Sequence, residues 1–288
     1  MASFVDMRRS LIILAWILTV SAAAPLASST SHAAVTYNRL ATNRLATNRL
    51  STNRLATNRL ATNKLATNVL VADPSAQELL STPEGRDLYS YIVSCALPAG
   101  VTIVATVDGT PYEFPGSVGL APRWLKRKLS KSGQGWVSAC LLARVNAHDT
   151  VEPISIRGKN PALATSPSEL VEFSLQEGAF YGNVFASDAD PPDWNACRGQ
   201  DQAQGETGGL VDRDCAEPDA LLDPTHTQCG FNYAGDCADY TPVIPTPYAC
   251  RAYDPTGVFF ISCHAQPAVK KWPHAKTYRQ VITTFVKP

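Results

Sequence analysis

The chain has 288 residues, of which 45% are hydrophobic and 17% charged, and its 25 basic and 25 acidic side chains cancel. The average hides a division, because residues 34–70 carry six basic side chains and no acid, whereas residues 71–288 carry 17 basic and 24 acidic ones. The acidic balance of this larger part argues against nucleic acid as a partner. After residue 33 no apolar run approaches the ~20 residues that span a bilayer, so we expect no transmembrane helix.

Residues 1–33 have the pattern of a secretory signal peptide. Arg8 and Arg9 precede an apolar run from Leu11 to Ala24, and Ser31-His32-Ala33 is a small-residue cleavage site. The alternative is a retained anchor, but a run of about 14 apolar residues is too short to span a bilayer. We therefore predict export, with a mature chain that begins near Ala34 and is secreted, extracellular or periplasmic.

Residues 34–70 repeat one five-residue phrase, in which leucine recurs every fifth position from Leu40 to Leu70. On an α-helix five residues advance ~500°, so the leucines form no stripe, and on a strand they alternate between faces. The ordered alternative is a short square-sectioned solenoid, which resembles pentapeptide-repeat proteins in period but differs in phase. We expect a flexible basic linker, because one leucine in five buries little apolar surface against ~1–2 kcal/mol of backbone entropy per residue.

The first half of the body, residues 71–186, reads as α+β. Thr82 and Pro83 predict the start of a helix that ends before Pro98, and residues 101–114 predict a hairpin that turns at Asp108-Gly109. Residues 119–130 predict a short basic helix, and residues 133–148 an apolar one. "EPISIRG" and "EFSLQEGAFYGNVF" predict strands.

Eight cysteines fit a chain that forms disulfides in an oxidising compartment. Cys95 and Cys140 each lie on the apolar stripe of a predicted helix, so we expect them to bridge two helices; the alternative is two free core cysteines. The remaining six crowd into residues 187–288 and allow 15 connectivities, among them a cross-strand bridge between Cys250 and Cys263. These six are Cys197, Cys215, Cys229, Cys237, Cys250 and Cys263.

Residues 187–288 differ from the first half, because residues 187–254 hold 13 acids and three bases among many prolines and glycines. We expect a loop-rich acidic lobe held by disulfides, with a hairpin over 248–263 and a closing strand over 277–286. The predicted fold is therefore a single disulfide-stapled α+β body with this lobe at its C-terminal end.

Several aspartates of the lobe offer hard oxygen ligands, and Ca²⁺ is the ion that such ligands suit, although no EF-hand spacing is present. A solvated acidic surface is the competing interpretation. The set comprises Asp188, Asp190, Asp193, Asp212, Asp214, Asp219, Asp223, Asp236 and Asp239.

Two further groups of residues are candidates for chemistry. Glu177 lies in the apolar sequence "LQEGAFYGN", where burial would raise its pKa toward that of a general acid, with Asp188 as partner; the alternative is a capping or ion-paired glutamate. The basic sequence "RWLKRKLSK" predicts contact with an anionic glycan, envelope polymer or membrane surface; the alternative is a solvated face. Its cations are Arg123, Lys126, Arg127, Lys128 and Lys131.

Four sequences, "STPEGRDLYSYIVSCALP", "GLAPRW", "WVSACLLARVN" and "EGAFYGNVF", together resemble a group of uncharacterised exported bacterial proteins. These pair an Asn-x-Leu-rich N-terminal repeat with a cysteine-containing body. The resemblance implies export and a bacterial origin but no activity. We therefore expect an exported binding or structural protein, and the alternative is a secreted hydrolase that acts on polysaccharide with Glu177 as its general acid.

Overall fold

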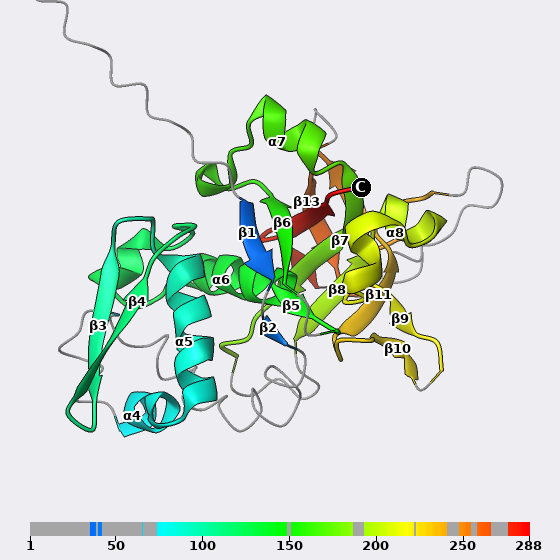
Figure 1. Cartoon of the computed structure of the whole chain (residues 1–288). Coiled ribbons are helices and arrows are strands. Elements are labelled where there is room, and N and C mark those ends of the chain that lie inside the picture. Colours follow the sequence, from blue (N-terminus) through cyan, green and yellow to red (C-terminus); the bar gives the residue numbers. More distant parts are fainter. Residues whose placement is uncertain are drawn as a thin grey trace, which may run out of the picture. The chain divides into compact units, whose positions relative to one another are not determined.

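Figure 1 shows the computed structural model of the chain. The structure describes residues 35–38, 40–41, 65, 74–148, 151–186, 193–221, 223–240, 248–254, 258–265 and 276–288, all within the unit Ser31–Pro288. The predicted α+β class is confirmed, with one large mixed sheet, three small ones and four disulfides in this part of the chain.

The large sheet has eight strands in the order β1-β6-β15-β7-β8-β11-β10-β9. Neighbours run antiparallel except for β8 and β11, which are parallel. The central strands β7 and β15 are buried almost throughout, as expected for strands covered on both faces. The strands are β1 Val35–Asn38, β6 Glu152–Arg157, β15 Ile282–Val286, β7 Leu175–Gly182, β8 Trp194–Arg198, β11 Asn232–Asp236, β10 Asp223–Thr227 and β9 Pro218–Asp219.

Helix α6 (Lys131–Ala143) packs against β7 and β15 and forms the centre of the core. It is apolar on nearly every side, and its Ser138 Oγ accepts a hydrogen bond from the Val184 N–H at 2.9 Å. Cys140 on α6 bonds to Cys95 on α5 (Pro83–Ala96), with Cα atoms 6.0 Å apart. The predicted bridge between two helices is confirmed. The other helical segments are α4 Pro74–Ser81, η1 Pro122–Leu125, η2 Pro161–Leu163, α7 Pro167–Glu172, α8 Gln200–Gln204 and η3 Gly208–Asp212.

The predicted helix start and hairpin in the first half are also confirmed. The Gly85 N–H donates to Thr82 Oγ1 at 3.0 Å, which caps α5. Strands β3 (Thr102–Val107) and β4 (Thr110–Pro115) turn at Asp108 and Gly109, whose φ angles of 48° and 81° are those of a two-residue hairpin turn. The hairpin covers α5 through the edge-to-face rings of Tyr89 and Phe114, which lie 4.7 Å apart.

The predicted basic helix over residues 119–130 is wrong, because only the 3₁₀ turn η1 (Pro122–Leu125) forms there. Trp124 and Leu129 are both buried. Five residues apart on a helix they would point ~140° away from each other, so the chain leaves the helical path to bury both.

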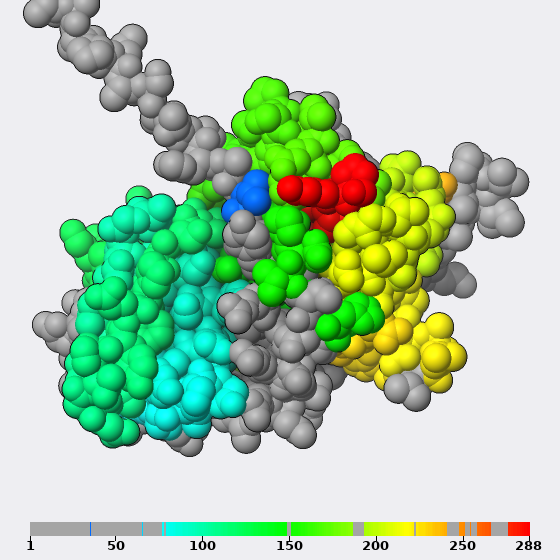
Figure 2. Space-filling model, in the orientation of Figure 1, coloured from blue at the N-terminus to red at the C-terminus, as the bar shows by residue number. Residues whose placement is uncertain are grey.

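The acidic C-terminal part is less irregular than its composition predicted. It supplies β8, β9, β10, β11 and β15 to the large sheet. It also forms a three-stranded sheet of its own from β12 (Cys250–Tyr253), β13 (Phe260–His264) and β14 (Thr277–Tyr278). The C-terminal residues, red in Figure 2, reach the surface beside the yellow segment that holds α8 and η3, where the Gly209 N–H donates to the Lys287 carbonyl at 3.0 Å.

Parts of the pentad repeat and its flanks belong to the body. Strand β1 pairs with β6 at the edge of the large sheet, and β2 (Leu40–Ala41) pairs in parallel with β5 (Val145–Asn146). Leu65 is fully buried, and its N–H donates to the Trp124 carbonyl at 3.1 Å. The rest of the predicted linker and the predicted signal peptide lie outside the described residues.

Candidate functional site

The basic segment, residues 122–131, runs from the 3₁₀ turn η1 to the first residue of α6 and is held by buried anchors. Trp124 is 1% exposed and packs edge-to-face on Phe185, with ring centroids 5.8 Å apart. Leu129 is buried near the end of the segment, and Ser130 then caps α6 by accepting the Gly133 N–H at 3.1 Å. With both ends held by the core, the polar residues between the anchors face solvent.

All five cations predicted to contact a polyanion are exposed, and within the described residues none of them forms an ion pair. Pro122, Arg123, Leu125, Lys126 and Arg127 line a hollow of about 520 Å³. Three cations beside one concave surface attract an anion, and guanidinium groups bind phosphate, sulfate and carboxylate oxygens in pairs. Trp124, in contrast, is buried and has no face left for a ligand.

Glu177 does not lie in a cleft. Its side chain on β7 is fully buried, where Oε1 accepts the Arg213 Nε–H at 2.7 Å and Oε2 accepts the Thr284 hydroxyl at 2.6 Å. Arg213 also donates from Nη2 to the Ala143 carbonyl at 2.8 Å. Glu177 therefore joins β7 to β15 directly and to the end of α6 through Arg213. Neither of its carboxylate oxygens faces solvent. Asp188, the partner predicted for Glu177, lies outside the described residues.

The aspartates predicted to bind Ca²⁺ are mostly engaged with protein partners instead. Asp236 accepts from Arg198 at 2.8 Å, Asp223 bonds to His226 at 2.7 Å, and Asp193 is held by Lys276 and Tyr278. Within the described part of the chain no three carboxylates converge, and the one group of three candidate metal ligands consists of cysteines. Asp188 and Asp190 fall outside that part.

A cluster that sequence reasoning missed joins His148, Asp214 and Glu206. The His148 Nε2 lies 2.6 Å from Asp214 Oδ2, and Asp214 has a left-handed φ of 51°. Its interaction with Asp214, and then partial burial, raises the pKa of Glu206 to about 7. Nothing in the sequence signals this cluster, because His148 is 66 residues from Asp214.

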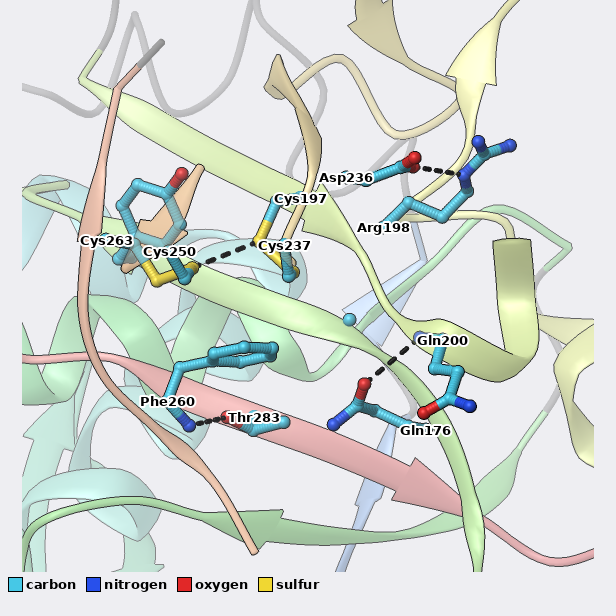
Figure 3. The surroundings of a disulfide bond; sticks show 12 residues. Gln176, Cys197, Arg198, Gln200, Asp236, Cys237, Cys250, Phe260, Cys263 and Thr283 are labelled. Atoms are coloured by element: carbon cyan, nitrogen blue, oxygen red, sulfur yellow. Dashed lines mark hydrogen bonds and ion pairs between the residues drawn. A yellow bond between two sulfur atoms is a disulfide. The ribbon is translucent and has the colours of Figure 1, made fainter. Parts of the chain in front are cut away.

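The cysteines form a second cluster (Figure 3). Cys250 is bonded to Cys263 across β12 and β13, as the predicted hairpin register allowed. The sequence did not predict how the other four cysteines pair, and the structure shows Cys197–Cys237 and Cys215–Cys229 bonds. Figure 3 shows the Cys197–Cys237 and Cys250–Cys263 bonds side by side, with 3.5 Å between Cys197 Sγ and Cys250 Sγ. Because all four sulfurs are in disulfides, they offer no thiolate to a metal in this state.

Comparison with protein-family models, curated proteins and solved structures finds no match to this chain. Among the described residues no helix has the length and apolarity needed to cross a bilayer. Four disulfides are typical of proteins in oxidising compartments. The inference of function therefore depends on the sites themselves.

Proposed function

We propose that this chain is an exported binding or structural protein that attaches to an anionic polymer or glycan of the cell envelope through the basic segment. The observation that carries the proposal is the set of five exposed cations, without ion-pair partners in the described structure, three of which line a hollow of about 520 Å³. A protein surface built only for solubility usually intersperses both signs of charge, whereas this segment has one.

The repeat supports the same proposal. Its six basic residues are accompanied by no acid, and Leu65, one of its leucines, is bound to Trp124 inside the basic segment. The cations of the basic segment create a positive potential that attracts a polyanion and that salt screens over ~10 Å. Export is supported by the signal-like leader and the disulfides.

Hydrolysis with Glu177 as general acid receives no support from its surroundings. A general acid must come within hydrogen-bond distance of the bond it protonates, and both oxygens of Glu177 are buried and occupied. Binding is the function that the described geometry favours.

The test is binding of the mature chain, residues 34–288, to dextran sulfate, with uncharged dextran as reference. The variant R123Q/K126Q/R127Q should bind the anionic polymer ~10- to 100-fold more weakly at low salt, since three contacts of up to ~1 kcal/mol each are lost. High salt should remove most of the difference.

The matched control, K159Q/R279Q/K287Q, removes three exposed cations outside the segment and changes net charge equally. It should retain most of the affinity. Equal weakening by both variants would mean that only net charge matters, and the basic segment would then not be the site. Binding of the wild type that is insensitive to salt would also contradict the proposal.

A further inference from the structure

Two disulfides meet where the large sheet faces the three-stranded sheet. Cys197 on β8 is bonded to Cys237, which directly follows β11, and Cys250 on β12 is bonded to Cys263 on β13. Each bond therefore links strands of one sheet. The sulfurs of Cys197 and Cys250 nevertheless lie 3.5 Å apart, and those of Cys197, Cys237 and Cys250 all lie within 4.8 Å of one another.

Backbone hydrogen bonds hold the two disulfides in this contact. The Cys250 N–H donates to the Cys237 carbonyl at 2.8 Å, and the Ala249 N–H donates to the Asp236 carbonyl at 2.8 Å. Further along the interface the Phe260 N–H donates to Thr283 Oγ1 at 3.0 Å. All four cysteines are at most 2% exposed, so the packed core keeps their sulfurs together.

We propose that Cys197, Cys237, Cys250 and Cys263 form a thiol–disulfide exchange site, in which Cys197 and Cys250 can bond and so link the two sheets covalently. Exchange requires a thiolate next to the sulfur of a disulfide, and the cluster supplies that neighbour as soon as one of its bonds is opened. No other cysteines of the chain bring three sulfurs this close in the described structure.

The bonds balance without a net change in oxidation state. When local opening of β13 exposes Cys263 Sγ, a small thiolate attacks it, which leaves a mixed disulfide on Cys263 and releases Cys250 as a thiolate. That thiolate attacks Cys197 Sγ, the Cys197–Cys250 bond forms, and the Cys197–Cys237 bond breaks with its electron pair on Cys237. The Cys237 thiolate then attacks Cys263 Sγ and returns the small thiol.

The exchange would change how the sheets are joined. In the structure they are held together by the buried residues around Tyr181 and Phe260 and by the hydrogen bonds above. A Cys197–Cys250 bond would join β8 to β12 directly. A thiol in the surroundings would thus convert two links within sheets, Cys197–Cys237 and Cys250–Cys263, into two links between them, Cys197–Cys250 and Cys237–Cys263.

Cys237→Ser tests the exchange without added reductant, because it leaves Cys197 as a free thiol. We expect its thiolate to attack Cys250 Sγ, so that after acid quench, alkylation and peptide mapping most of the label is on Cys263 and a Cys197–Cys250 peptide is found. Cys229→Ser is the matched control, because it frees Cys215 in a pair without a neighbouring disulfide, and its label should stay on Cys215.

Label that stays on Cys197, with the Cys250–Cys263 peptide intact, would overturn the proposal. A second measurement requires no substitution: wild-type protein treated with one equivalent of a phosphine should also yield the Cys197–Cys250 peptide. If Cys237→Ser does not fold, the phosphine experiment tests the proposal by itself. Finding only the native disulfides and free thiols in it would overturn the exchange.

Discussion

At the scale of single residues, the buried pair of Glu177 and Arg213 is the feature that most changes the interpretation of the sequence. The apolar sequence around Glu177 agrees with its burial. The role of a buried carboxylate, however, depends on the groups that contact its oxygens. With Arg213 and Thr284 on its two oxygens, the carboxylate is satisfied and structural.

Replacing Glu177 by Gln should lower the free energy of unfolding by ~3–5 kcal/mol, because the Arg213 guanidinium would remain buried without a counter-charge. Urea unfolding measures this loss. The control is Glu172→Gln, whose pair with Lys287 is about half exposed and should be worth less than ~1 kcal/mol. Similar small losses for both variants would show that the buried pair does not hold the strands together.

The carboxyl pair of Glu206 and Asp214 should make stability depend on pH. The pKa of Glu206 is raised from 4.5 to about 7 by its hydrogen bond with Asp214 and by partial burial. Between these two values the folded protein keeps a proton that the unfolded chain has lost, so this contribution is complete below pH 4.5 and disappears as pH rises through about 7.

We expect the effect to be small, below ~1 kcal/mol, because solvent screens the exposed group. Urea unfolding of the wild type and of Glu206→Gln at about pH 5 and about pH 8 measures it. The wild type should lose more stability than the variant between these values. Parallel changes in the two proteins would show that the pKa of Glu206 is not raised in the folded protein.

Among the helices and strands, the sequence predicted correctly those features that depend only on residues close together in the chain. The Thr82 cap and the Asp108-Gly109 turn depend on neighbours a few residues away, and both formed as predicted. The basic helix failed because Trp124 and Leu129 both pack into the core, and that demand comes from residues distant in sequence.

The disulfide between α5 and α6 should contribute more stability than a short-range one. Changing Cys95 and Cys140 to Ala opens a loop of 45 residues and should cost about 4 kcal/mol, compared with about 3 kcal/mol for the 14-residue loop of Cys215 and Cys229. Denaturant unfolding of the two double variants measures the difference. A larger loss for the short loop would mean that native packing outweighs loop entropy here.

At the scale of the whole molecule, the body contacts the N-terminal segment at two places, near the start of the repeat and again at Leu65. Residues 35–38 and 40–41 pair with β6 and β5, and Leu65 is buried against Trp124. Residues 42–64 connect these points. The sequence predicted a flexible linker over residues 34–70 with the body beginning at residue 71, but residues 35–38 and 40–41 already pair with strands of the body.

If residues 46–60 are a flexible linker, as expected from the sequence, deleting them should change the free energy of unfolding by less than about 1 kcal/mol, since a shorter loop is only slightly easier to close. Deleting residues 34–41 should cost on the order of 2 kcal/mol or more, because the four paired positions of β1 and β6 are lost. Thermal unfolding of both variants checks this. Equal destabilisation would instead favour the solenoid.

Features that depend on residues close together in the chain could be predicted from the sequence: the α+β class, the cap and hairpin turn, and the cysteine-rich C-terminal part. The sequence also predicted the bridge from Cys95 to Cys140, because each residue lies on the buried stripe of its own helix. Only the tertiary structure decided that β15 lies between β6 and β7, that Glu177 meets Arg213, and that Cys197 touches Cys250. These contacts depend on the path of the whole chain, on which local propensity carries no information.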